Sequence, residues 1–419
     1  MKVFKFGGAS VKDASGIINL LKILKQFGNK KILIVVSAMG KTTNAFEKVV
    51  NAYFNDLKKI KFFIDEIKSM HFNIIDSLFH NLDHDIKFRV SEIFSRLDQF
   101  INLNTKKDYS FVYDQIVSNG ELLSTIIIHH YLKNNEFKNQ WLDSRLCIKT
   151  DSYFRDANLD WIETEKEIKK NVDKDLVTIT QGFIGGDSKN NSTTLGREGS
   201  DYSAAIFAYA LDAESVTIWK DVPGVLNGDP RVFDNSILLN KISYREAIEL
   251  AFYGASVIHP KTIQPLQKKE IPLYVKSFEE PLNKGTSVSK GISIDPNVPC
   301  YILKSNQVLL KMSSLDFSFI VEDNISEIFS LLYKHQMKVE LMQNSAISFS
   351  VCINNKYDRL NELIEELKLK YKLKVYDNVE LYTIRYFNKE SIKSLSKIRD
   401  KIILEQRTEK ILQVVKSQE

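Results

Sequence analysis

The placement of glycine divides this chain of 419 residues into two parts. Glycine at high density is typical of backbone that turns with positive φ or approaches a ligand closely. Residues 292–419 contain no glycine. We therefore predict that the glycine-containing part of the chain binds a ligand, whereas residues 292–419 form regular, packed helices and strands. Most of the sixteen glycines, which run from Gly7 to Gly291, stand in the clusters KFGGAS (5–10), QGFIGGD (181–187), TTLGREGSD (193–201) and DVPGVLNGDPR (221–231).

Composition narrows the class of protein. The length fits two or three globular domains. The net charge of +5 comes from 58 basic and 53 acidic residues without long blocks of one sign, so we expect no nucleic-acid partner. Cys147, Cys300 and Cys352 are too far apart for a disulfide framework or a zinc motif, which suits a reducing compartment. No apolar run approaches 18 residues and no signal core opens the chain, so we expect a cytoplasmic protein without a membrane partner.

Strands and helices alternate over residues 1–290, which predicts an α/β fold with a mostly parallel sheet sandwiched by helices. Such sheets bind ligands at the carboxyl ends of their strands. Residues 41–119 contain neither glycine nor proline and carry apolar residues at helical spacing, so we expect a mainly helical excursion there. The predicted strands lie in VFKFGG (3–8), KILIVVSAMG (31–40), DLVTITQGFIGG (175–186) and ESVTIWKDV (214–222), and the predicted helices cover 18–28, a segment from about 200, and 243–260.

The second part follows a different plan. Proline also ends at Pro299, so we place a linker at 291–305. Residues 306–378 read as strand, helix, strand, strand, helix and strand, which is the ferredoxin-like α+β order. Residues 379–419 add a helix at 389–400 and two short strands, which we interpret as a partial second copy.

The first glycine loop is the candidate phosphate-binding site. The GKT of MGKTT is no P-loop, because Val35 stands where that loop needs glycine, and no G-x-G-x-x-G follows the first strand. Lys5 lies two residues before Gly7 and Gly8, so its ammonium can reach the space toward which the loop amides point. A solvated lysine beside an ordinary turn is the alternative.

Two further segments carry candidate side chains. Arg197 offers a planar fork for a carboxylate or phosphate, whereas Ser200 and Asp201 stand where a helix starts and would equally serve as N-caps. Asp221, Asp229 and Arg231 stand among turn residues, for which a surface turn is the alternative. Lys261, in the triplet with His259 and Pro260, is expected to end the helix over 243–260 and to complement its C-terminus.

Seven motifs and the tail occur in a fixed order: KFGGAS, VVSAMGKTTN, SNGELLS, TQGFIGGD, TTLGREGSD, KDVPGVLNGDPR, YGASVIHPKT and the ferredoxin-like segment. Over essentially its whole length the chain thereby resembles the aspartate kinases of the amino acid kinase family. The resemblance implies phosphorylation of the L-aspartate β-carboxylate to 4-phospho-L-aspartate with ATP and Mg²⁺, the first step toward lysine, threonine, methionine and diaminopimelate. It also implies a tail of paired ACT modules, which bind an amino-acid effector such as lysine or threonine and form a homodimer or a higher homo-oligomer.

The resemblance also implies a role for each site residue. Lys5 and Asp201 are catalytic, Lys5 by stabilising the transferred phosphoryl group and Asp201 by ordering the lysines. Arg197 holds the α-carboxylate of aspartate and Glu121 its α-ammonium. The substrate pocket comprises Ser37, Thr43, Glu121, Phe183, Arg197 and Ser200. The nucleotide side comprises Lys5, Gly7, Gly8, Lys220, Asp221, Asp229, Arg231 and Lys261. No metal ligand is assigned, and an effector is expected at Gln343, Asn344 and Ser345.

Four features depart from the family pattern. Ala9 replaces the threonine of KFGGTS, and Lys220 with Asp221 replaces a threonine-aspartate pair, adding a cation near the phosphates. Glu198 replaces a glycine of GRGGSD, and we expect it to face solvent because it would otherwise compete for Arg197. The second ACT copy is short by about a helix and a strand.

Two other functions stay open at this point. Another member of the family would act on glutamate, acetylglutamate, uridylate or carbamate, but Glu121, Arg197 and the tail favour aspartate. An amino-acid sensor with a silent kinase domain is the other alternative, and Lys5, Arg197 and Asp201 argue against it. We expect no fusion with homoserine dehydrogenase, because the chain ends at Glu419 without a dinucleotide domain.

Overall fold

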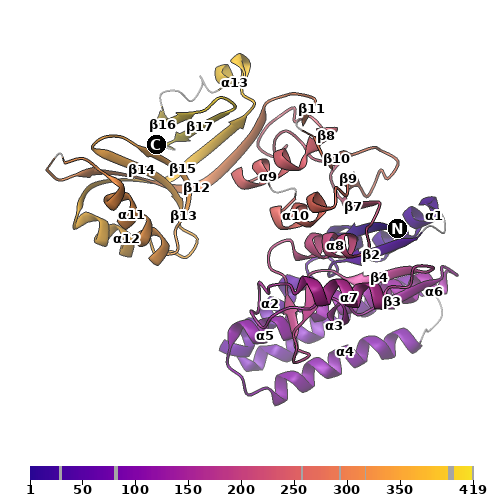
Figure 1. Ribbon diagram of the computed structural model, residues 1–419. Helices are drawn as coiled ribbons and strands as arrows, with labels where there is room; N and C mark the ends of the chain where they lie inside the picture. The colour runs from indigo at the N-terminus through magenta and orange to yellow at the C-terminus, as the bar shows by residue number, and fades with distance from the viewer. Residues whose placement is uncertain are drawn as a thin grey trace. The chain divides into compact units, whose positions relative to one another are not determined.

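The structure is a computed structural model that describes residues 1–27, 31–79, 84–255, 258–291, 294–316, 318–394 and 401–417. The chain forms two compact units (Figure 1). The first comprises Met1–Val225, Leu238–Ile248 and Val257–Ile294, and the second comprises Leu226–Ile237, Glu249–Ser256 and Asp295–Glu419. In these described ranges no helix is both long and apolar enough to cross a membrane.

A mostly parallel sheet forms the centre of the first unit. Its strands are β1 (Lys2–Phe6), β2 (Ile32–Val36), β3 (Asn139–Leu142), β4 (Val177–Gln181), β7 (Ser215–Lys220), β8 (Lys241–Ser243), β9 (Leu273–Ser277), β10 (Thr286–Ser289) and β11 (Ile294–Asp295). Their order is β11-β8-β10-β9-β7-β1-β2-β4-β3. Of the pairings described, β9 with β10 is antiparallel and the others are parallel. Every residue of β2 is buried, as its β-branched sequence predicts for a central parallel strand.

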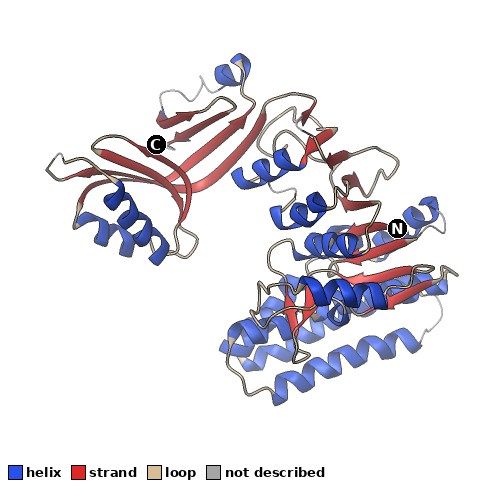
Figure 2. Ribbon diagram, viewed as in Figure 1, coloured by secondary structure: helices blue, strands red, loops and turns tan. Residues whose placement is uncertain are grey.

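Helices cover both faces of this sheet (Figure 2). Helix α8 (Gly199–Ala210) packs on β1, β2 and β7 and also contacts α7 (Trp161–Asn171) and α10 (Pro260–Lys268). Helix α6 (Asn119–Asn134) packs on β2, β3 and β4, while α1 (Ala14–Phe27) contacts α3 (Ile60–Leu78). A hairpin of β5 (Ile184–Gly186) and β6 (Ser192–Thr194) stands apart from the main sheet.

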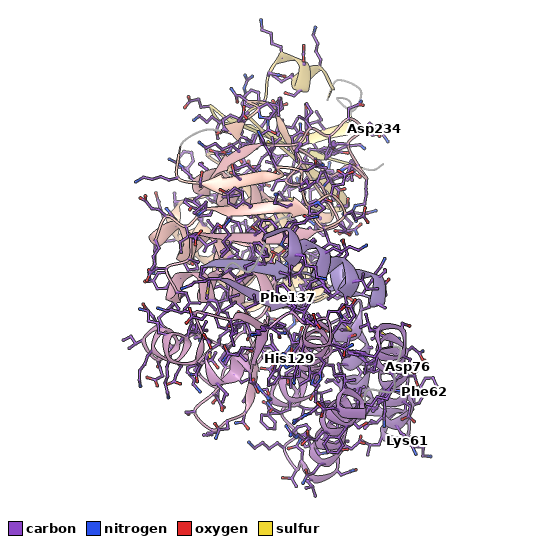
Figure 3. The ribbon with its side chains drawn as sticks, turned by 90° about the vertical axis from the view of Figure 1, so that its right-hand side faces the viewer. Lys61, Phe62, Asp76, His129, Phe137 and Asp234 are labelled. Carbon is purple, nitrogen blue, oxygen red and sulfur yellow. The ribbon has the colours of Figure 1, made fainter. Side chains whose placement is uncertain are left out.

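The segment 41–119 is largely helical. It holds α2 (Thr42–Asn55), α3 (Ile60–Leu78), α4 (His84–Leu103) and α5 (Tyr109–Val117). Their apolar faces join one core with β1, β2 and α6. Figure 3 shows Lys61, Phe62 and Asp76 in this helical layer, and His129 and Phe137 beside the sheet. Asp76 forms an ion pair with Lys87 of α4, 2.6 Å apart, which links two of these helices.

Our prediction of one helix over 243–260 was wrong. Helix α9 (Tyr244–Tyr253) ends before Gly254, whose φ of +114° ordinary residues rarely adopt. Residues 256 and 257 lie outside the described residues. His259 then caps α10, accepting a hydrogen bond from the Lys261 amide at Nδ1, and Pro260 occupies the first helical position that proline favours. Lys261 therefore begins a helix instead of ending one.

The second unit contains one antiparallel sheet. In chain order, the elements of this unit are β12 (Cys300–Ser314), α11 (Glu322–Lys334), β13 (Lys338–Asn344), β14 (Ser348–Asn354), α12 (Leu360–Lys368), β15 (Tyr371–Arg385), α13 (Lys389–Ser394), β16 (Ile402–Arg407) and β17 (Ile411–Lys416). The βαββαβ order is the predicted one. The strand order is β13-β14-β12-β15-β17-β16, so the last two strands extend the sheet of the first copy through β15. Strand β12 begins within the segment 291–305, and the predicted helix 389–400 is described only to residue 394.

Candidate active site

A cavity of about 280 Å³ in the first unit gathers eight of the fifteen residues predicted for catalysis, substrate binding and nucleotide binding. It lies where β1 and β7 end and where α6 and α8 begin. Because β1 pairs with β2 on one side and β7 on the other, the carboxyl ends of the three strands meet at one edge of the sheet. The lining residues are Lys5, Ser37, Thr43, Glu121, Phe183, Gly196, Glu198, Gly199, Ser200, Asp201 and Lys220.

Two lysines share one carboxylate in this cavity. Lys5 Nζ lies 2.7 Å from Asp201 Oδ1, and Lys220 Nζ lies 3.7 Å from Asp201 Oδ2. Burial alone would raise the pKa of Asp201, but the charges of Lys5 and Lys220 outweigh it and hold that pKa below its ordinary value. Asp201 therefore stays ionised and fixes two cations at the end of β1 and β7, where they can face an anion.

Glu121 lies in the first turn of α6 and is 2% exposed. Its Oε1 accepts a hydrogen bond from the Ala38 amide at 3.2 Å, and burial raises the pKa of the carboxyl to about 8. Gly120 permits this contact, because a Cβ there would lie 2.9 Å from the Ala38 Cβ. This raised pKa favours the protonated carboxyl near pH 7, and a ligand cation beside Glu121 would favour the ionised form.

The first glycine loop packs closely against the loop after β2. A Cβ on Gly8 would lie 2.8 Å from the Ala38 carbonyl oxygen and 2.9 Å from that of Gly40, so the neighbouring backbone requires glycine there. A Cβ on Gly7 would lie 3.5 Å from Lys5 Nζ. This is an ordinary van der Waals distance, so the neighbouring atoms do not themselves require glycine at position 7.

Glu198 corrects one of our expectations. It lines the cavity instead of facing solvent, and its Oε2 is buried. The reason is the turn that leads into α8, in which Gly196 has a φ of +76° and Glu198 a φ of +53°. Gly199 continues this tight turn, because a Cβ there would lie 2.7 Å from the Phe183 ring. The sequence signalled the glycines of this turn but not the direction of the side chain between them.

The other predicted residues lie outside this cavity. Arg197 is exposed and does not line it. Asp221 borders a second cavity of about 370 Å³ beside Ser10, Asp13 and the start of α1. The remaining residues lie elsewhere: Lys261 forms an ion pair with Asp156, Asp229 and Arg231 of the second unit pair with each other at 2.6 Å, and Gln343, Asn344 and Ser345 are exposed at the end of β13.

Comparisons with known proteins give the family. The model of the amino acid kinase family matches residues 1–277. Lysine-sensitive aspartokinase 3 of Escherichia coli K12 is 33% identical over 357 residues, which cover 84% of this chain and 78% of that protein. The crystal structure of E. coli aspartokinase III with lysine and aspartate in the T-state has a TM-score of 0.83 at 28% identity, covering 99% of this chain and 95% of the other. The R-state of the same enzyme, with aspartate and ADP, has a TM-score of 0.81 at 28% identity and covers 100% and 96%. A family match over more than half of the residues, together with a relative one-third identical over most of its own length, means that the chain belongs to the amino acid kinase family and, within it, to the aspartokinases.

Proposed function

We propose that this protein transfers the γ-phosphoryl group of ATP to the β-carboxylate of L-aspartate and so begins the pathway to lysine, threonine, methionine and diaminopimelate. The observation that carries the proposal is the cluster of Lys5, Asp201 and Lys220 in one cavity with the buried Glu121. The E. coli relative supports it, because its structures contain aspartate and ADP.

Phosphoryl transfer to a carboxylate requires that the two substrates are positioned in line and that positive charge surrounds the transferred group. A carboxylate with an ordinary pKa of about 3.9 is already ionised near pH 7, so the nucleophile needs no general base. Its oxygen forms the new bond to the γ-phosphorus while the bond from that phosphorus to the leaving oxygen of ADP breaks. Lys5 and Lys220, held by Asp201, supply cations for the oxygens of the transferred group.

Recognition of the amino acid falls to the other side chains. Glu121 meets the α-ammonium, and its raised pKa makes it responsive to that charge. Arg197 holds the α-carboxylate; it stands between two residues that line the cavity, Gly196 and Glu198. The cavity-lining residues proposed to contact aspartate besides Glu121 are Ser37, Thr43, Phe183 and Ser200.

For the nucleotide side we keep Gly7, Gly8, Lys220, Asp221, Asp229, Arg231 and Lys261 as proposed contacts. The place of Lys220 beside Asp201 and Lys5 in the cavity supports its part of this assignment. Among the described residues, no group of three or more His, Cys, Asp or Glu side chains is placed to hold a metal ion, and Asp201 is already engaged by two lysines. We propose that Mg²⁺ arrives with the nucleotide, held by its phosphates and by water.

We further propose that the second unit is regulatory. Its effector would be lysine or threonine, bound near Gln343, Asn344 and Ser345. The name of the lysine-sensitive relative and its lysine-bound structure support this class of ligand. We also propose that the protein forms a homodimer or a higher homo-oligomer through its ACT modules. Its proposed location is the cytoplasm. Three buried free cysteines suit a reducing compartment.

One assay tests the proposal. Purified protein is incubated with ATP, Mg²⁺, L-aspartate and hydroxylamine, which converts an acyl phosphate to a hydroxamate. We expect aspartyl hydroxamate with L-aspartate and none with L-glutamate. A folded protein that binds ATP but forms no hydroxamate would overturn the kinase proposal and favour the amino-acid sensor.

A further inference from the structure

Two carboxylates of the same cavity each have a buried oxygen without a partner. Glu121 Oε2 and Glu198 Oε2 accept no hydrogen bond from the part of the chain that the structure describes. Both residues line the cavity. A buried polar oxygen without a partner is unfavourable, and once both side chains are ionised their oxygens are suited to a ligand that brings N–H groups.

No hydrogen bond or ion pair among the described residues explains the place of the Glu198 side chain. Its side chain makes no capping hydrogen bond to α8, although it stands at the N-cap position of that helix. Its φ of +53° is uncommon for a residue with a side chain, and Phe183, with a φ of +69°, lines the same cavity. Strained residues that converge on one cavity are typical of functional sites.

The charged groups around Glu198 leave it available to a ligand. Within the described residues, no basic side chain forms an ion pair with it. Lys261 is engaged by Asp156, and Lys5 lies against Asp201. The charge of Glu198 acts on His259. Burial lowers the pKa of the His259 imidazole, and the negative charge of Glu198 partly offsets this effect.

We propose that Glu198 is a further specificity-determining residue, which holds the α-ammonium of the amino-acid substrate together with Glu121. An ammonium has three donors and can satisfy both orphan oxygens at once. The inference rests on the proposed function, which supplies the aspartate and the role of Glu121. It departs from our initial expectation for Glu198, and it gives the cavity a second carboxylate with which to reject dicarboxylates that lack an ammonium.

Steady-state kinetics of Glu198→Gln test the inference. The variant keeps the shape of the side chain and removes its charge. We expect KM for L-aspartate to rise about tenfold, the effect of losing one charge-assisted hydrogen bond, while kcat and KM for ATP stay unchanged. Succinate, which lacks the ammonium, is expected to inhibit the variant more strongly than the wild type, because the variant lacks the charge that repels a plain diacid.

Two further variants make the result interpretable. Glu198→Gly, which removes the backbone strain, is expected to fold and to show the same rise in KM. Glu136→Gln is the matched control, because Glu136 also has a left-handed backbone, with a φ of +59°, but is exposed beyond the end of α6; its KM is expected to stay that of the wild type.

Three outcomes would overturn the inference: an unchanged KM for aspartate, an equal loss in succinate binding, or a higher Mg²⁺ requirement in place of the KM change. The last would make Glu198 a cation ligand. An inactive wild type would instead contradict the proposed kinase function, so the two failures are distinguishable.

Discussion

Binding of aspartate is expected to release a proton from Glu121. Burial raises the pKa of this carboxyl to about 8, so at pH 7 about 0.9 of the empty sites carry the proton. The ammonium of a bound amino acid favours the carboxylate and lowers that pKa. We therefore expect up to about 0.9 proton released per site at pH 7 and about half a proton at pH 8.

Isothermal titration calorimetry measures this release. Aspartate is titrated in two buffers with different ionisation enthalpies, and the difference in binding enthalpy gives the number of protons. Glu121→Gln should release none. Glu92→Gln, a change on the surface of α4, should release as many as the wild type. Wild-type protein that binds aspartate at pH 7 without releasing a proton would refute the reasoning, because Glu121 would then be ionised in the empty cavity.

The same pKa has a consequence for stability. The native state holds a proton between the ordinary glutamate pKa of 4.5 and about 8, where the unfolded state does not. Stability therefore falls as pH rises through this window, by about 5 kcal/mol when complete. Glu121→Gln should lack this slope and be more stable than the wild type at pH 8.5. Urea unfolding followed by tryptophan fluorescence reports this, because Trp141, Trp161 and Trp219 all lie in the first unit.

Three other changes test the site. Lys5→Ala should lower kcat about 10²- to 10³-fold with little change in KM for aspartate, whereas Lys2→Ala on the same strand should keep kcat; equal kinetics for the two would argue against the phosphoryl role. Arg197→Ala should mainly raise KM for aspartate, and an unchanged KM would contradict its assignment to the α-carboxylate. Gly120→Ala should cost about 1–3 kcal/mol in urea unfolding, because its Cβ would lie 2.9 Å from the Ala38 Cβ; wild-type stability would show that α6 shifts freely.

Elements with a strong pattern of apolar residues were predictable from the sequence. Turns that interrupt such a pattern were not. The run KILIVVSAMG contains the fully buried β2, and the alternation of elements in the tail gave its βαββαβ order. The strand predicted within 175–186 ends at Gln181, and the second strand, β5, which follows Phe183 with its φ of +69°, was not predicted. The apolar pattern over 243–260 likewise continued across Gly254, where the backbone turns.

Some positions of the site residues were likewise predictable from the sequence, and others were not. Lys5, Glu121 and Asp201 stand at the end of a strand or the start of a helix, so a parallel sheet brings them to one edge whatever the details of its loops. The directions of Arg197 and Glu198 depend on individual φ values within one turn, which the sequence does not contain. The ion pair of Lys261 with Asp156 joins distant segments, and only the fold identifies that partner.

The charges that line the cavity explain why an amino acid should suit it better than a plain diacid. Two lysines share Asp201 in this cavity, and two carboxylates that line it, Glu121 and Glu198, have buried oxygens without a hydrogen-bond partner among the described residues. A diacid would leave the oxygens of Glu121 and Glu198 unpaired and add negative charge beside them. An ammonium would pair with both and leave the lysines for the phosphoryl group. Selectivity for the amino group and stabilisation of the transferred phosphoryl are therefore supplied by separate sets of side chains, so Glu198→Gln should impair the first while leaving the second intact.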